Sequence, residues 1–198
     1  MTQAPDFAGL VLAGGRGERL GGRDKGLIPL RGEPFARHLV RVLRSRLETV
    51  IISANRAREQ YEGMADAVLS DQCFPQQGPL AGLFEGLVWA RERGFAGVLV
   101  TSCDTPNLST QWVARLVDAA QAAPGVAYLS RLDERVQPLH GYYPVGALTS
   151  IEQFLNEGER RVRRLAAELS PVWIDCQDLS EDFVNVNEPG DLDRLRGR

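Results

Sequence analysis

The chain has 198 residues, of which 43% are hydrophobic and 25% are charged, values that are typical of a globular domain and argue against a disordered, collagenous or coiled-coil protein. The formal net charge of -3 gives no general attraction to nucleic acid or to an anionic membrane, so any polyanionic ligand must be bound locally. The 23 basic residues are 22 arginines and a single lysine, Lys25.

The three cysteines, Cys73, Cys103 and Cys176, are odd in number and form no C-x-x-C pair, so neither a disulfide framework nor a zinc knuckle is expected. The first residues lack the basic and apolar segments of a secretory signal, and no apolar run approaches the ~20 residues that span a bilayer. We therefore expect a cytoplasmic protein that binds neither membrane nor nucleic acid.

Short β-rich runs alternate with amphipathic segments along the chain, which predicts an α/β fold with a mainly parallel sheet. In the first half, Pro34 is expected at the first position of a helix. The predicted strands of this half are 8–12, 49–53, 67–69 and 98–101, and a second helix is predicted over 80–92.

The second half of the chain continues the pattern less regularly. Helices are predicted at 110–122, 147–156, 160–168 and from about 189, and strands at 126–130, 140–145, 172–176 and 183–186. Because no repeat, low-complexity tract or linker interrupts the sequence, we predict a single domain over residues 1–198.

Polar residues or glycines follow four of the predicted strands. The first strand runs into Gly14 and Gly15, and the next three end near Asn55, Asp71 and Asp104. In an open parallel sheet the carboxyl ends of the strands line the ligand crevice, so we expect these four ends to converge on one site.

The segment 12–26 combines six glycines with four cations, the latter being Arg16, Arg19, Arg23 and Lys25. Glycine allows positive φ and a close approach of backbone N–H groups to a ligand, which suits a phosphate-binding loop after a strand. It matches neither the dinucleotide motif, since Leu20 stands at the third glycine, nor the P-loop, since Gly26 follows Lys25. A solvated loop with glycine turns is the alternative interpretation.

The motif L-A-G-G-x(4)-R-L-G-G-x-D-K-G at 12–26 resembles the signature loop of the nucleotidyltransferases that act on molybdopterin, specifically the molybdenum cofactor guanylyltransferases. The resemblance spans residues 7 to about 192. Its further motifs are S-A-N-R at 53–56, P-L-A-G at 79–82, C-D-T-P at 103–106, G-E-R-R-V at 158–162 and F-V-N-V-N at 183–187.

The resemblance implies a Rossmann-like, three-layer nucleotidyltransferase fold that transfers GMP from GTP to the terminal phosphate of molybdopterin, with Mg²⁺ and release of pyrophosphate. It assigns GTP binding to about 7–106 and molybdopterin binding to about 107–198. The GTP-binding residues it implies are Leu12, Ala13, Gly14, Gly15, Lys25, Asn55, Asp71 and Asp104. Transient contacts with molybdenum-insertion proteins and molybdoenzyme chaperones are also implied.

The chemistry of the residues agrees with this reaction. Mg²⁺ prefers oxygen ligands and keeps several waters, so Asp104 with substrate phosphates would be a sufficient metal site. We expect Lys25 and Arg19 to hold the departing pyrophosphate, and Asp71 and Asn55 to contact the base or ribose. Asp104, Asp71 and Asn55 could instead have turn or capping roles. Cys103 is expected to be a buried apolar residue rather than a nucleophile.

The molybdopterin or ribose contacts are expected at the start of the helix near Pro79 and in the arginine-rich segment that follows residue 158. The residues are Pro79, Leu80, Gly82, Arg160, Arg161, Asn185 and Asn187. A solvated helix face is the alternative for the arginines, and an edge-strand turn for the two asparagines.

Three other functions remain open at this level. The first is CMP transfer to the same pterin, since the preference for guanine over cytosine rests on the resemblance alone. The second is nucleotidyl transfer to a sugar or polyol phosphate. The third is a catalytically silent GTP-binding module that delivers cofactor, against which the combination of Lys25 and Asp104 argues.

Overall fold

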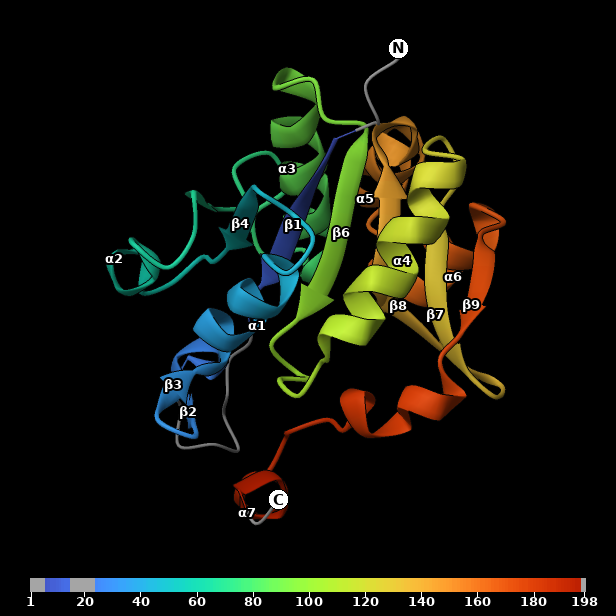
Figure 1. Ribbon diagram of the computed structural model, residues 1–198. Coiled ribbons are helices and arrows are strands. Elements are labelled where there is room, and N and C mark those ends of the chain that lie inside the picture. Colours follow the sequence, from blue (N-terminus) through green and yellow to red (C-terminus); the bar gives the residue numbers. More distant parts are fainter. Residues whose placement is uncertain (1–5, 15–23, 197–198) are drawn as a thin grey trace.

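A seven-stranded sheet forms the centre of the molecule (Figure 1). The computed structural model describes residues 6–14 and 24–196. The sheet has the order β5-β4-β1-β6-β8-β7-β9, and all its strands except β8 run in the same direction. The strands are β1 (Phe7–Leu12), β4 (Val50–Ser53), β5 (Ala67–Leu69), β6 (Gly97–Ser102), β7 (Tyr128–Leu132), β8 (Arg135–Pro144) and β9 (Val172–Asp175). The predicted α/β class with a mainly parallel sheet is confirmed.

Helices cover both faces of this sheet and make three layers (Figure 1). The α-helices are α1 (Phe35–Leu43), α2 (Arg58–Tyr61), α3 (Pro79–Glu92), α4 (Thr110–Ala122), α5 (Leu148–Asn156), α6 (Val162–Glu168) and α7 (Pro189–Arg196). Shorter elements are the hairpin of β2 (Pro29–Leu30) and β3 (Glu33–Pro34) and the 3-10 helices Lys25–Leu27, Val145–Ala147 and Gln177–Phe183.

The two faces bury separate cores because side chains alternate along each strand. In β1, Phe7 and Val11 pack with α1 and α4, whereas Leu10 and Leu12 pack with α3, α5 and α6. Every residue of β1 and β6 is buried, which explains why both strands read as continuous apolar runs in the sequence.

The chain reverses its direction of travel across the sheet at β1. It moves from β1 outward to β4 and β5, and then returns to β6 on the other side of β1. Ligands bind outside the carboxyl ends of parallel strands at such a switch point. The ends of β1, β4, β5 and β6 are therefore the place to look for a site.

Several predicted boundaries differ from the structure. Pro34 is the last residue of β3 and caps α1 rather than opening it. The predicted strand 126–130 begins only at Tyr128, and the strand predicted at 140–145 is the longer, antiparallel β8. The helix predicted from residue 160 begins at Val162, because Glu159 takes up the N–H groups of the two residues before it.

The strand predicted over 183–186 was wrong. This segment leaves the 3-10 helix Gln177–Phe183 in an extended conformation, and the Val186 N–H bonds to the carbonyl of Asp104 (2.8 Å). Phe183 and Val186 are buried, so their apolar pattern reflects packing on the core and not membership of the sheet.

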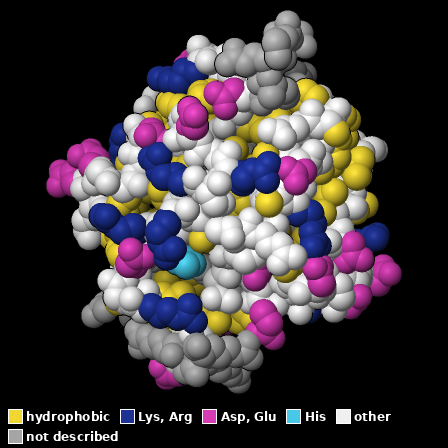
Figure 2. Space-filling model, viewed as in Figure 1, with side chains coloured by type: hydrophobic (Ala, Val, Ile, Leu, Met, Phe, Trp, Pro, Cys, Tyr) yellow, Lys and Arg dark blue, Asp and Glu magenta, His cyan; other side chains and the backbone are white. Residues whose placement is uncertain are grey.

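The surface agrees with the small net charge. On the face that carries α1 and α4, basic and acidic side chains are interspersed (Figure 2). In the described part of the chain, no helix is both long and apolar enough to cross a membrane.

Candidate functional site

A cavity of about 590 Å³ opens at the carboxyl ends of the parallel strands. It is lined by Leu12, Gly14, Asp24, Ser53, Asn55, Arg56, Asp71, Gln76, Gly78, Pro79, Gly82, Ser102, Asp104, Leu139 and Arg160. Gly14, Asn55, Asp71 and Asp104 follow four different strands, so the predicted convergence of the strand ends is confirmed.

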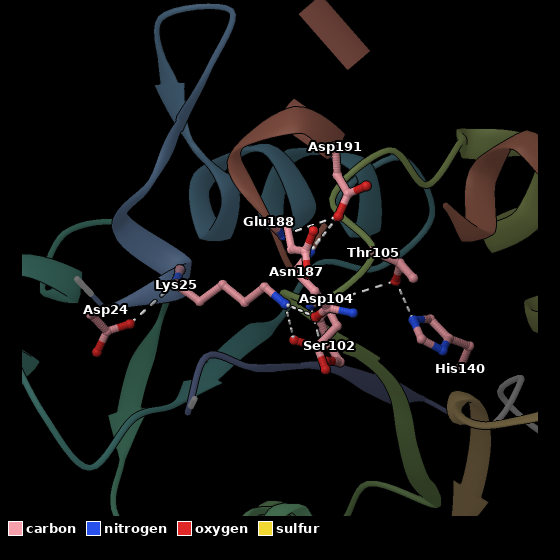
Figure 3. A network of polar contacts seen from close by, with 10 residues as sticks. Asp24, Lys25, Ser102, Asp104, Thr105, His140, Asn187, Glu188 and Asp191 are labelled. Atoms are coloured by element: carbon pink, nitrogen blue, oxygen red, sulfur yellow. Dashed lines mark hydrogen bonds and ion pairs between the residues drawn. The ribbon is translucent and has the colours of Figure 1, made fainter. Parts of the chain in front are cut away.

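Lys25 connects two segments beside this cavity through its side-chain ammonium (Figure 3). Its Nζ donates to Asp104 Oδ1 at 2.6 Å and to Asn187 Oδ1 at 2.8 Å. The lysine side chain is almost fully buried, whereas the Asp104 side chain is 52% exposed. A buried ammonium thus joins the glycine loop, the end of β6 and the segment before α7, while the carboxylate stays open to ligands.

The backbone around Lys25 is held from the opposite side by α2. Asp24 caps the short 3-10 helix by accepting the Gly26 N–H at 3.2 Å, and the Tyr61 hydroxyl donates to the same carboxylate oxygen. A Cβ at Gly26 would clash with that hydroxyl. Burial and the hydrogen bond to Asp24 raise the pKa of Tyr61, so it remains a donor. Glycine at position 26 therefore serves close packing.

Asn55 and Asp71, which both line this cavity, are joined by two hydrogen bonds. Asn55 Nδ2 donates to Asp71 Oδ2 at 2.6 Å, and the Asp71 N–H donates to Asn55 Oδ1 at 2.8 Å. Burial raises the pKa of the Asp71 carboxyl, which the hydrogen bond from Asn55 opposes. Asp71 Oδ1 is buried and has no partner among the described residues. An unpaired buried acceptor is costly, so a ligand donor that reached it would be favoured.

The start of α3 supplies another wall of the cavity. Gly78 precedes the helix with a φ of 74°, a conformation that favours glycine, and Pro79 is its first residue. A Cβ at Gly82 would lie 2.6 Å from Ser53 Oγ and 2.9 Å from Leu12 Cδ2. Glycine at position 82 thus lets α3 approach the ends of β1 and β4 closely.

A second cavity of about 350 Å³ adjoins the first. Its lining residues are Ser102, Asp104, Val136, Gln137, Pro138, Leu139, His140, Arg161, Val162, Arg163 and Asn185. Ser102, Asp104 and Leu139 line both cavities. The exposed carboxylate of Asp104 therefore stands at the boundary between two binding spaces.

Strand β8 is tied to the Asp104 segment by a buried contact between Thr105 Oγ1 and His140 Nε2 (Figure 3). Burial lowers the pKa of His140 to about 4, so its imidazole is neutral at pH 7. His140 Nδ1 is buried without a partner in the described part of the chain. His140 thus holds β8, which lines the smaller cavity, against the segment that carries Asp104.

Most of the predicted site residues line one of these two cavities or contact Asp104 or Lys25. Leu12, Gly14, Asn55, Asp71, Pro79, Gly82, Asp104 and Arg160 line the larger one, Arg161 and Asn185 line the smaller one, and Lys25 and Asn187 contact Asp104 or its ammonium partner. Gly15 and Arg19 lie outside the described residues.

Other predictions need correction or refinement. The side chains of Ala13 and Leu80 are fully buried in the two cores, so only their backbone groups remain for a ligand. Asn185 and Asn187 lie in no strand, although the strand predicted over 183–186 included the first of them. Cys103 is buried as predicted, and burial raises the pKa of its thiol, which leaves it a poor nucleophile.

Sequence reasoning missed several residues of the site. Ser53 and Ser102 are the last residues of β4 and β6, so the strand-end rule that identified Asn55 and Asp104 could have found them. Gln76, Leu139 and His140 carried no such signal, since they belong to a loop and to the antiparallel strand.

Comparisons with known proteins show which family the chain belongs to. Residues 9–172 match the family model of the MobA-like NTP transferase domain. A molybdenum cofactor guanylyltransferase from Pseudomonas fluorescens is 37% identical over 188 residues, covering 95% of this chain and 92% of its own. One from Cupriavidus metallidurans is 37% identical over 198 residues, with coverages of 97% and 95%.

A solved structure shares the fold. The molybdopterin-guanine dinucleotide biosynthesis protein A from Archaeoglobus fulgidus superposes with a TM-score of 0.79 at 21% identity, covering 96% of this chain and 97% of its own. The matched family model covers most of the chain, from within β1 to the first residue of β9. The chain therefore belongs to the MobA-like NTP transferase family and groups within it with the molybdenum cofactor guanylyltransferases.

Proposed function

We propose that this protein transfers GMP from GTP to the terminal phosphate of molybdopterin and releases pyrophosphate. The observation that carries the proposal is the position of Asp104, whose exposed carboxylate lines both cavities. A reaction between two bound substrates needs adjoining sites that meet at the reacting atoms. In this arrangement GTP occupies the larger cavity, molybdopterin occupies the smaller one, and the α-phosphorus lies near Asp104.

The guanine base would lie beside Asn55 and Asp71. Guanine presents adjacent N–H donors on its Watson–Crick edge, and a carboxylate accepts such donors. The unpartnered Oδ1 of Asp71 supports this assignment, because a bound guanine would supply the missing donor. Cytosine has a single amino donor next to acceptors on the corresponding edge. Asn55 and Asp71 therefore favour GTP over CTP.

The phosphates of GTP would extend from the base toward Lys25. Its buried ammonium is a compact positive charge that can neutralise the β- and γ-phosphates as pyrophosphate leaves. Arg19 is proposed to assist from the glycine loop. The backbone of Leu12, Ala13, Gly14 and Gly15 is proposed to pack against the nucleotide. These groups would stabilise the charge that develops on pyrophosphate.

Mg²⁺ fits the donor set at Asp104. An exposed carboxylate that faces substrate phosphates is the arrangement that Mg²⁺ uses when it keeps part of its water shell. No group of three or more histidine, cysteine or acidic side chains suited to a metal occurs in the described ranges, so we propose Asp104 as the protein ligand. The chemistry that a bound Mg²⁺ supplies is neutralisation of phosphate oxygens.

The acceptor phosphate would enter from the smaller cavity and attack the α-phosphorus. Its P–O bond to GMP forms as the bond between the α-phosphorus and the bridging oxygen of pyrophosphate breaks. The attacking phosphate is already ionised at neutral pH, so the protein need not remove a proton. Arg160, Arg161 and Asn185 line the path, and Asn187 holds Lys25 beside it.

This division assigns the donor mainly to residues 7–106 and the acceptor mainly to 107–198, within one domain over 1–198. We further propose a cytoplasmic enzyme that meets molybdenum-insertion proteins and molybdoenzyme chaperones transiently. Nucleotidyl transfer to a sugar or polyol phosphate would use the same fold, but the arginine-lined second cavity favours a larger anionic acceptor.

The test is incubation of the protein with molybdopterin and Mg²⁺ together with GTP, CTP, ATP or UTP, following pyrophosphate and the nucleotide product. The expected result is pyrophosphate release with GTP and formation of molybdopterin guanine dinucleotide. Preferential transfer from CTP would contradict the guanine assignment. Binding of GTP without turnover would favour the silent GTP-binding module that delivers cofactor.

A further inference from the structure

Glu159 is an acidic side chain in the middle of the arginine-rich segment, and its role is not explained by the reaction. It lies between α5 and α6, where Gly158 has a φ of 73° and the Glu159 N–H bonds to the carbonyl of Phe154 (2.9 Å). Its side chain is only 13% exposed, while the Arg161 and Arg164 side chains that pair with it are 74% and 64% exposed.

The carboxylate of Glu159 makes five hydrogen bonds. Its Oε1 accepts the N–H groups of Arg160 and Arg161, both at 3.0 Å. Arg161 also grips it with two parallel bonds, Nε to Oε1 at 2.9 Å and Nη2 to Oε2 at 2.7 Å. Arg164 Nη1 adds a bond to Oε2 at 2.9 Å. The hydrogen bonds from Arg161 hold the pKa of this carboxyl well below its usual range.

These contacts fix the two arginines that face the cavities. The bonds to both N–H groups set the backbone just before α6, from which Arg160 reaches the larger cavity and Arg161 the smaller one. The two parallel bonds also fix the plane of the Arg161 guanidinium. Without them, an exposed arginine side chain would adopt many orientations. The Arg161 side chain is thus oriented before any ligand arrives, and the backbone that carries Arg160 is held in place.

Stability alone is a weak explanation for this arrangement. Exposed arginine–carboxylate pairs contribute little to folding, because water screens them and the side chains lose entropy. The charge of Glu159 does not explain its position either. A carboxylate beside the four arginines Arg160, Arg161, Arg163 and Arg164 reduces their attraction for an anion. What the contacts supply is orientation, which lowers the entropy lost when a ligand binds.

We propose that Glu159 is a positioning residue that presents Arg160 and Arg161 to the phosphate of the acceptor at the boundary of the two cavities. The inference rests on the proposed function, because it takes molybdopterin as the anion that these arginines meet. A positioning role and a pure charge effect predict opposite changes in anion affinity when the Glu159 charge is removed. Removing a negative charge should strengthen anion binding if only charge matters, and should weaken it if orientation matters.

The test compares Glu159→Gln with the wild-type protein. Glutamine keeps an oxygen that can accept the two N–H groups, so the loop is expected to fold, but it loses the ion pairs with Arg161 and Arg164. Molybdopterin binding is measured by equilibrium dialysis without nucleotide, and GTP binding is measured separately. We expect the Kd for molybdopterin to rise roughly 3- to 10-fold, the scale of ordering one or two long side chains on binding. The Kd for GTP should change by less than about twofold.

Glu157→Gln is the matched control. Glu157 is exposed two residues earlier, and its Oε1 contacts Gln153 Nε2 at 3.1 Å rather than an arginine. The substitution removes the same charge from the same segment. We expect it to leave molybdopterin binding unchanged or slightly tighter. A Glu159→Gln variant that binds molybdopterin as tightly as this control would overturn the proposal.

A double-mutant cycle with Arg161→Ala tests whether Glu159 acts through that arginine. Because residues that act as a unit are not additive, Glu159→Gln should weaken binding much less in the Arg161→Ala background. Equal losses in both backgrounds would refute action through Arg161. A melting curve for each variant separates a local effect from loss of the fold.

Failure of the proposed function gives a different pattern. If the wild-type protein binds molybdopterin but transfers no GMP to it, the transfer reaction is refuted, and the Glu159 comparison can still be made by dialysis. If the wild-type protein does not bind molybdopterin, the arginines do not meet this acceptor and the positioning role for it is overturned.

Discussion

The two cavities are built on different parts of the sheet. The larger one lies at the carboxyl ends of β1, β4, β5 and β6, which are parallel neighbours. The smaller one lies against the antiparallel strand β8 and the segment that leads into α6. The larger cavity thus follows a general rule of parallel sheets, whereas the smaller one depends on particular contacts such as those of Glu159 and His140.

Asp104 is shared by the two cavities, so its loss should have the largest effect. We expect Asp104→Ala to lower turnover by about 10²–10³-fold, the scale of removing one preorganised electrostatic contact. The Asp104 side chain is half exposed, but its loss leaves the buried Lys25 ammonium with Asn187 as partner, so a melting curve accompanies the kinetics to separate lost turnover from lost stability. Steady-state pyrophosphate release with GTP, molybdopterin and Mg²⁺ measures the loss. Asp118→Ala, which removes a surface partner of Arg46, is the control, and near-normal turnover of Asp104→Ala would place the metal elsewhere.

A change at Asp71 should affect the donor side alone. Asp71→Asn replaces one acceptor oxygen by a donor, so the variant should discriminate less between GTP and inosine triphosphate, which lacks the 2-amino donor. We expect the ratio of kcat/KM values to fall by roughly 10-fold, the worth of one hydrogen bond to a charged group. The KM for molybdopterin should not change. An unaltered ratio would mean that Asp71 does not contact the base.

Gly82 tests the packing of α3 against the wall of the larger cavity. A Cβ at this position would lie 2.6 Å from Ser53 Oγ, so Gly82→Ala should lower the free energy of unfolding by about 1–3 kcal/mol. In a chain of this length, each kcal/mol lowers Tm by roughly 2–4 °C. Gly146→Ala is the control, since a Cβ there meets no heavy atom within 4 Å. Equal melting temperatures for the two variants would contradict the close approach.

The last effect concerns His140 at the second cavity; it is absent at neutral pH and appears only in acid. Because burial lowers the pKa of His140 from 6.5 to about 4, the unfolded state binds a proton between these values and the folded state does not. This histidine therefore leaves stability intact above about pH 6.5 and reduces it as pH falls toward 4. The loss approaches about 1.4 kcal/mol per pH unit.

Urea unfolding between pH 7.5 and pH 5 measures this dependence. His140→Gln removes the titrating group, so the free energy of unfolding should fall less steeply with acid than in the wild-type protein. Other groups, including His38, contribute equally to both proteins and cancel in the comparison. Parallel curves would mean that His140 is accessible to protons in the folded state.

Most residues of the larger cavity could be predicted from the sequence because the signals that mark them are local. Buried parallel strands read as apolar runs, and the polar residues that follow them, such as Asn55 and Asp71, mark the site directly. The single lysine proved informative for the same reason, since it lies within a loop that needed one compact, buried charge.

The contacts around Asp104 and the smaller cavity were predicted less well because they join distant segments. His140 meets Thr105, and Lys25 meets Asn187, across 35 and 162 positions of the chain. The segment 183–186 has the alternation of a strand, but its backbone is held by Asp104 instead of a neighbouring strand. Neither the antiparallel direction of β8 nor the role of Glu159 has a signature in residue spacing.

The central claim is that donor and acceptor occupy separate cavities that meet at Asp104. A crystal structure with molybdopterin and a GTP analogue that carries a methylene bridge between its α- and β-phosphorus atoms tests it most directly. We expect guanine beside Asp71, the triphosphate beside Lys25, and the molybdopterin phosphate between Arg161 and Asp104. Molybdopterin bound in the larger cavity, or guanine bound against β8, would contradict it.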